Sequence, residues 1–154
     1  MRFLIVAVGR AKAGPEKTLF EHYQARLRAP FSLELIEVEE KRALRGDQLR
    51  EREAALLQGF ISNSAIVIAL DEREKSLSSK DFAGQIDNWR DQGIRELVFM
   101  IGGADGLDKV IIDQAHQAIS FGAQTWPHML VRGLLAEQLY RAQCILSGHP
   151  YHRA

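Results

Sequence analysis

The chain has 154 residues, of which 46% are hydrophobic and 26% charged, so we expect one domain over residues 1–154 with a substantial hydrophobic core. Its formal net charge is zero, which excludes a protein that coats nucleic acid non-specifically, because such proteins are strongly basic. No segment approaches the roughly 18 apolar residues of a membrane span, and a single cysteine, Cys144, excludes an internal disulfide and favours a reducing, cytoplasmic setting.

Apolar runs alternate with helical spacings along the whole chain. Short uninterrupted runs such as Ala65–Leu70 are typical of the buried strands of a parallel sheet. We expect Asp47 to cap one helix and Ser78 or Ser79 to cap the next. Strands that alternate with helices predict an α/β fold with a mostly parallel sheet flanked by helices. The predicted elements are a strand at 3–8, a helix at 16–27, a strand at 31–38, a helix at 47–59, a strand at 65–70, a helix from 78 or 79 to 93, a strand at 96–101, a helix at 108–117, a marginal strand at 118–120 and a helix at 128–146.

Ligands of such folds bind beyond the carboxyl ends of the strands, so the loops after Leu70, Ile101 and Ser120 are candidate walls of a site. The loop after Ile101 reads Gly-Gly-Ala-Asp-Gly, over residues 102–106. Glycines permit positive φ and let a backbone approach a ligand closely. The spacing fits neither a Walker A loop nor the dinucleotide fingerprint. Contact with a ligand and a plain strand-to-helix turn therefore remain equal alternatives.

The loop before the last helix places Trp126 between Gly122 and Pro127. Such a loop is able to wrap an aromatic ligand, but the pattern alone favours Trp126 as a cover of the hydrophobic core. The helix that follows has an apolar stripe wider than one sheet face needs, which suggests core packing with a surplus for a helix-mediated dimer. Taken alone, Arg132 on this helix is expected to be a solvated charge. Cys144 is expected to lie in the core.

The chain ends in His149-Pro-Tyr-His-Arg153, a concentration of rings and positive charge. Rings stack on unpaired bases and arginine bridges phosphates, so this tail predicts contact with nucleic acid, against the alternative of a disordered end with incidental aromatics. No cluster of His, Cys and carboxylate residues has the spacing of a metal site, so no metal is expected.

Six motifs in order resemble one family over the whole chain, the RlmH family of ribosomal RNA large-subunit methyltransferases in the SPOUT superfamily. The motifs are Leu70-Asp71, Leu77-Ser-Ser79, Ile101-Gly-Gly-Ala-Asp-Gly106, Thr125-Trp-Pro-His128 with Leu130-Val-Arg132, Glu137-Gln-Leu-Tyr-Arg141 and His149-Pro-Tyr-His-Arg153. The resemblance implies a carboxyl-terminal trefoil knot, which is a rare exception to the usual topology rules and is invisible in the periodicity. It also implies a homodimer, S-adenosylmethionine as cofactor, and methylation of N3 of a pseudouridine in a 23S rRNA stem-loop of the assembled ribosome.

The resemblance further implies roles for individual residues. The cofactor positions of the family match Leu70, Gly103, Gly122, Ala123, Gln124, Thr125, Trp126 and Pro127. The expected catalytic residues, which would accept the N3 proton or stabilise the developing anion, are His149, His152 and Arg153. The expected substrate-binding residues are Arg132, Tyr151, His152 and Arg153.

Two other classes of protein remain as alternatives. A non-enzymatic ribosome- or RNA-associated factor would use the same tail without binding S-adenosylmethionine. A flavodoxin-like nucleotide binder would need a phosphate loop after the first strand, and residues 9–14 match one only weakly. Titration with S-adenosylhomocysteine separates these readings.

Overall fold

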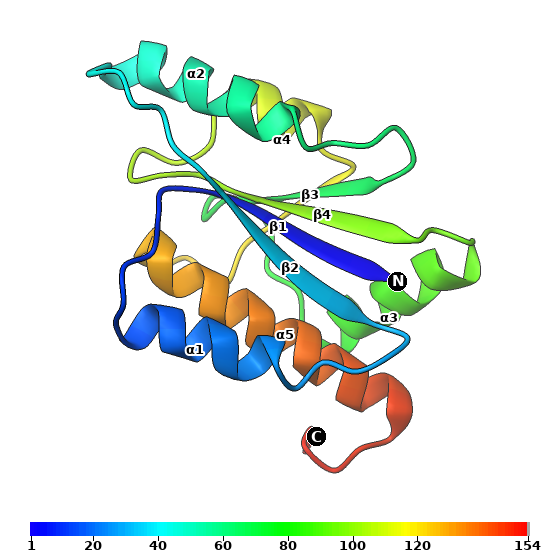
Figure 1. Cartoon of the computed structure of the whole chain (residues 1–154). Helices are drawn as coiled ribbons and strands as arrows, with labels where there is room; N and C mark the ends of the chain where they lie inside the picture. Colours follow the sequence, from blue (N-terminus) through cyan, green and yellow to red (C-terminus); the bar gives the residue numbers. More distant parts are fainter. Residues whose placement is uncertain (154) are drawn as a thin grey trace.

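A computed structural model describes residues 1–153 as a five-stranded sheet between two layers of helices (Figure 1). The strands run in the order β2-β1-β4-β3-β5, and each neighbouring pair is parallel. The predicted α/β fold with a mostly parallel sheet is therefore confirmed. The elements are β1 Arg2–Val8, α1 Pro15–Gln24, β2 Ser32–Val38, α2 Gly46–Gln58, β3 Ile66–Leu70, α3 Ser79–Asp91, β4 Glu96–Ile101, α4 Lys109–Gln114, β5 Gln117–Ile119 and α5 His128–Ser147.

The sheet separates two hydrophobic cores. Helices α1, α3 and α5 cover the face that lies below the sheet in Figure 1, and α2 and α4 cover the opposite face. Alternate residues of β1 serve the two sides, because successive strand side chains point in opposite directions. Phe3 and Ile5 pack with Leu135 of α5, whereas Leu4 and Val6 pack on the side of α2 and α4. Apolar residues on both faces explain why β1, β3 and β4 read as uninterrupted apolar runs.

Two predicted helix ends are wrong. Helix α1 ends at Gln24, three residues before the predicted end. Helix α4 ends at Gln114, because Ala115 adopts extended backbone (φ −66°, ψ 142°) and residues 117–119 pair with β3. Tertiary pairing has here overridden a helical pattern, as it often does near element boundaries.

One predicted helix cap is correct and the other is wrong. The Ser78 hydroxyl accepts a hydrogen bond from the backbone N–H of Asp81 at 3.1 Å, so Ser78 caps α3. Asp47 does not cap α2, since that helix already begins at Gly46. Asp47 lies instead in the first turn, where it interacts favourably with the helix dipole and pairs with Arg50.

Arg132 is buried, which contradicts the prediction of a solvated charge. Only 1% of the surface of Arg132 is exposed to solvent. The guanidinium donates to Oε2 of Glu37 at 2.6 Å and to the carbonyl oxygens of Val8 and Gly9 at 2.9 and 2.8 Å. Glu37 also accepts from the backbone N–H of Ala11 at 2.6 Å. Arg132 thus ties the first turns of α5 to the carboxyl ends of β1 and β2, where strand carbonyls require donors.

Burial raises the pKa of the Glu37 carboxyl, but hydrogen bonds from Ala11 and Arg132 more than offset this effect, so the pKa lies below its usual value of 4.5. A carboxyl whose pKa is lowered by folding stabilises the protein above its unfolded pKa. That contribution is lost as the pH falls through the folded pKa. The clamp between Arg132 and Glu37 therefore weakens in acid.

We predict that Arg132→Met lowers the free energy of unfolding by about 3–5 kcal/mol, because it leaves a partly buried carboxylate without its partner. Urea denaturation at neutral pH measures the effect. Lys109→Met, which removes an exposed ion pair with Asp113, is the control and should change stability by no more than about 0.5 kcal/mol. An Arg132→Met variant that is as stable as the wild type would contradict this role of Arg132.

The ion pair also predicts a pH dependence. The difference in the free energy of unfolding between the wild type and Glu37→Gln should become smaller below about pH 4.5.

Candidate active site

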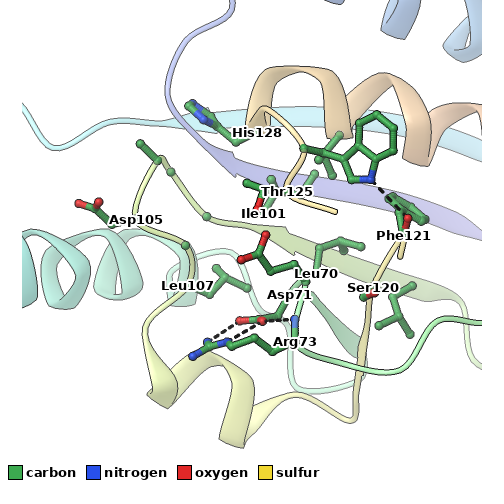
Figure 2. A pocket seen from close by; sticks show the side chains of 18 of the residues that line it. Leu70, Asp71, Arg73, Ile101, Asp105, Leu107, Ser120, Phe121, Thr125 and His128 are labelled. Carbon is green, nitrogen blue, oxygen red and sulfur yellow. Dashed lines mark hydrogen bonds and ion pairs between the residues drawn. The ribbon is translucent and has the colours of Figure 1, made fainter. Parts of the chain in front are cut away.

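The carboxyl ends of β3, β4 and β5 meet around a cavity of about 360 Å³ (Figure 2). Its walls are residues 70–73, 101–107, 119–122 and 124–126, with Arg50 from α2 and His128 and Val131 from α5. The loops after Leu70, Ile101 and Ser120, which the sequence predicted as walls of a site, therefore lie together. The volume is within the range of small-molecule sites.

Pairing between distant segments holds these loops in place. The N–H of Asp71 donates to the carbonyl of Ile119 at 3.0 Å, and that of Ser120 donates to the carbonyl of Lys75 at 3.1 Å. The Ser120 hydroxyl then bonds Gly122 at its N–H and carbonyl, at 3.0 and 3.1 Å. The segment after β5 is thus fastened against the segment after β3 before it turns toward α5.

The Gly-Gly loop is a compact turn whose own backbone leaves no room for a side chain at Gly102. A Cβ on Gly102 would lie 2.5 Å from the carbonyl carbon of Gly106, which no side chain can tolerate. A Cβ on Gly103 would meet Val8 at 3.1 Å and Glu53 at 3.4 Å, so it would point toward β1 and α2. The family resemblance implies that Gly103 is a cofactor position, but the strictest steric demand falls on Gly102. The glycines of this loop therefore offer the cavity only their backbone.

Carboxylates line two sides of the cavity. The hydrogen bond from Arg73 lowers the pKa of the Asp71 carboxyl, and the two side chains form an ion pair at 2.7 Å. Figure 2 shows this pair below Leu70, with Asp105 across the cavity. Beside the Gly-Gly loop, burial and then the charge of Asp105 raise the pKa of Glu53. Among the lining residues, the three carboxylates of Asp71, Glu72 and Asp105 outnumber the guanidinium groups of Arg50 and Arg73. This small acidic excess favours a ligand that carries positive charge.

Trp126 lines both the first cavity and a second one of about 610 Å³, and residues 119–122 also line both. Its residue is 39% exposed and its indole N–H donates to the carbonyl of Phe121 at 3.3 Å, so the prediction that Trp126 covers the hydrophobic core is wrong. The second cavity lies along α3 and α5, where Leu134, Glu137 and Arg141 contribute to its lining. Trp126 is therefore a shared wall.

His128 is a residue of the cavity that the sequence reasoning missed. It lines the first cavity and is half-buried. Burial and then the charge of Arg132 lower its pKa below the usual 6.5, so its imidazole is neutral at pH 7. Its place in a Trp-Pro-His sequence at a helix start gave no chemical signal, because only the fold brings it to the cavity.

The structure brings most of the expected cofactor residues together, and it places the tail elsewhere. Ala123 and Pro127 lie in the same exposed loop but outside the lining. The expected positions that line the first cavity are Leu70, Gly103, Gly122, Gln124, Thr125 and Trp126. Neither Arg132 nor the tail residues His149, Tyr151, His152 and Arg153 are among the lining residues.

The tail folds back onto its own α5. The Tyr151 hydroxyl lies 3.1 Å from Glu137, and His152 lies 3.4 Å from Arg141. At 1.5 Å of rise per residue, Glu137 and Arg141 are about 14 and 20 Å along the helix from His128. His149 and Arg153 are exposed. Within one chain, the tail and the first cavity are therefore separate sites.

Two further classes of site find no support within residues 1–153. His, Cys, Asp and Glu side chains form no cluster of three that is suited to a metal ion. None of the helices in this range combines the length and apolarity needed to cross a membrane.

Comparison with known proteins identifies a family for this chain. A family model described as "Predicted SPOUT methyltransferase" matches residues 1–152. The chain is 55% identical over 153 residues to the ribosomal RNA large subunit methyltransferase H of Paramagnetospirillum magneticum, covering 99% of both chains. It is 51% identical over 154 residues to the protein of the same name from Rhodospirillum centenum, covering 100% of both.

Solved structures share the fold at much lower identity. A "Probable Methyltransferase" from Bordetella pertussis superposes with a TM-score of 0.52 at 16% identity, covering 92% of this chain and 94% of that one. A "probable methylase family protein" from Haemophilus influenzae gives a TM-score of 0.54 at 10% identity, covering 99% and 70%. At these identities the likeness concerns the fold alone.

The glycines of the loop give a graded prediction. Gly102→Ala should lower the free energy of unfolding by about 1–3 kcal/mol, because its methyl group meets backbone that cannot move aside. Gly103→Ala should cost less, since it meets the Val8 side chain, which can shift. Gly84→Ala, in open space on α3, is the control and should stabilise by up to about 1 kcal/mol. Thermal or urea unfolding measures the order, and a Gly103→Ala cost above that of Gly102→Ala would contradict the steric account.

Proposed function

Because the chain belongs to the SPOUT methyltransferases, and among them to the ribosomal RNA large subunit methyltransferase H (RlmH) family, we propose that it transfers a methyl group from S-adenosylmethionine to N3 of a pseudouridine in 23S rRNA. The single observation that best supports this proposal is the cavity walled by the loops after β3, β4 and β5. Its small-molecule size, apolar walls and small acidic excess suit a ligand with a flat ring and a positive charge.

The residues of the cavity fit S-adenosylmethionine. Leu70 and the loop from Gly122 to Pro127 would hold the adenine, with Trp126 as one wall and the backbone of Gly103 as another. When bound, the cofactor supplies an electrophilic methyl group on a sulfonium. Asp105 lines the cavity and favours that positive charge over the neutral thioether that remains after transfer. The protein contributes binding and alignment to an in-line displacement.

The proton on pseudouridine N3 must leave at or before methyl transfer. A histidine is the natural base near neutral pH. His149 and His152 in the tail were expected for this role, and His128 joins them because its imidazole is neutral and lines the cavity. The Arg153 guanidinium would stabilise the negative charge that develops on the base.

A homodimer would complete the site. The tail of one chain rests against Glu137 and Arg141, away from its own cavity, so the tail of a second copy is the more suitable source of substrate contacts. The second cavity, with half-buried Leu134 in its lining, gives α5 a surface for that copy. Arg132, as a buried clamp, would position α5 rather than bind the substrate.

The trefoil knot is part of the same proposal. The segment after β5 pairs with residues after β3 through Ser76 and Ser120, then crosses to α5 on the sheet face opposite α4. A trefoil knot would require such a crossing, because the carboxyl-terminal part of the chain would have to pass through a loop formed by an earlier part. The zero net charge suits a folded particle such as the assembled ribosome in the cytoplasm, where contacts are spread over a dimer.

The function is tested by separating cofactor binding from methyl transfer. Wild-type protein should bind S-adenosylhomocysteine in calorimetry and methylate ribosomes that lack the modification. Arg153→Ala should lower methylation by at least about 100-fold, because charge stabilisation in the transition state is lost, while the affinity for S-adenosylhomocysteine stays within about twofold. Arg95→Ala is the control, because Arg95 is exposed and lies just before β4, at the amino ends of the strands.

Two results would count against this function. Failure of the wild type to bind S-adenosylhomocysteine would favour a non-enzymatic ribosome- or RNA-associated factor. Near-normal methylation by Arg153→Ala would remove the tail from catalysis.

A further inference from the structure

All three tyrosines of the chain meet around the carboxyl-terminal tail. Tyr23 belongs to α1, Tyr140 to α5 and Tyr151 to the tail. The ring centroids of Tyr140 and Tyr151 are 4.8 Å apart at 62°, an edge-to-face arrangement, and those of Tyr23 and Tyr140 are 6.1 Å apart. Aromatic pairs favour such separations, so the tail is packed against two helices far apart in sequence.

Two arginines enclose this aromatic group. The Arg26 guanidinium, just beyond α1, lies 4.7 Å from the centre of the Tyr140 ring and 5.6 Å from that of Tyr151. Arg141 lies 4.9 Å from the Tyr151 ring. Both cations are within the range of cation–π attraction. The Tyr151 ring is thus held by a neighbouring ring and by two cations.

The hydroxyl groups form a directed chain. The Tyr151 hydroxyl lies 3.1 Å from Oε1 of Glu137 and 3.3 Å from the Tyr23 hydroxyl. A carboxylate only accepts, so Tyr151 donates its proton to Glu137 and accepts one from Tyr23. Arg141 forms an ion pair with Glu137 on the same helix. Burial raises the pKa of Tyr151, which keeps its phenol protonated as the donor.

The backbone leads Tyr151 into this position. Gly148 adopts left-handed backbone with φ of 68°, which ends α5 and reverses the chain. The N–H of His149 then donates to the carbonyl of Cys144 at 2.8 Å, and the N–H of Tyr151 to Nδ1 of His149 at 3.1 Å. The tail is therefore a short hook with one inward ring, and His149 and Arg153 are exposed on either side of it.

We propose that Tyr151 is the anchor of the tail, and that Tyr23 is a positioning residue that fixes it through their hydroxyl groups. The anchor determines where His149, His152 and Arg153 project. Tyr151 therefore acts through protein contacts and does not stack on a base of the RNA. This inference rests on the proposed function, since the position of the tail affects turnover only if the tail acts on a substrate.

The experiment combines a double-mutant cycle with a measurement that needs no substrate. Tyr23→Phe, Tyr151→Phe and the double variant keep all three rings and remove only hydroxyl groups. Millisecond hydrogen–deuterium exchange of the Tyr151 and His152 amides in the full-length protein reports release of the tail. Loss of a hydroxyl link should raise this exchange by roughly 3–10-fold. Thr18→Val removes a hydroxyl from α1 that bonds Gly14, and is the matched control.

Turnover should follow the exchange. In ribosome methylation, kcat of each single variant should fall by about 3–10-fold, with KM and S-adenosylhomocysteine affinity unchanged. The kcat of the double variant should equal that of Tyr151→Phe alone, because Tyr151→Phe already removes the hydrogen bond that Tyr23→Phe removes. Multiplied losses, or wild-type tail exchange in Tyr23→Phe, would overturn the proposal. If wild-type protein has no methyltransferase activity, the proposed function fails while the exchange measurement still decides the anchor.

Discussion

The buried guanidinium of Arg132 fixes α5 against the sheet, and both parts of the proposed site depend on that helix. Arg132 bonds Glu37 and the last carbonyls of β1 within the first turns of α5. The same turns carry His128 to the cavity, and the preceding loop supplies Trp126. A buried ion pair stabilises little on balance. Its value here is positional, because it sets the end of α5 at the carboxyl edge of the sheet.

Helix α5 also sets the distance between the cavity proposed to bind the cofactor and the tail proposed to bind the substrate. Its first turn lines the cavity, and its middle holds the tail through Glu137 and Tyr140. A rigid helix between them prevents the tail of one chain from serving its own cavity without rearrangement. Under the proposed function, two paired copies would form a complete site, in which the cavity comes from one copy and the tail from the other.

Elements whose signal is local were predictable from the sequence. Apolar runs identified the strands, and their order placed the loops after Leu70, Ile101 and Ser120 at one edge. Contacts between distant residues were not predictable. Nothing in the sequence around Arg132 indicates that it pairs with Glu37. The pattern therefore predicted a solvated charge, although the side chain is buried. The tail showed the residue types for nucleic-acid contact, but periodicity cannot reveal that one of its rings turns inward. Cofactor, reaction and knot came only from the family resemblance.

The central claim is that one copy provides the cofactor cavity and another provides the tail, and complementation between two inactive variants tests it most directly. Gly122→Val would distort the cavity wall, because its φ of 107° disfavours a branched side chain. It would leave the tail intact, whereas Arg153→Ala does the reverse. Each variant alone should be inactive. Coexpressed in equal amounts, they should recover about a quarter of wild-type methylation, because half of the dimers are mixed and each has one complete site. A coexpressed pair as inactive as its components would contradict a site shared between two copies.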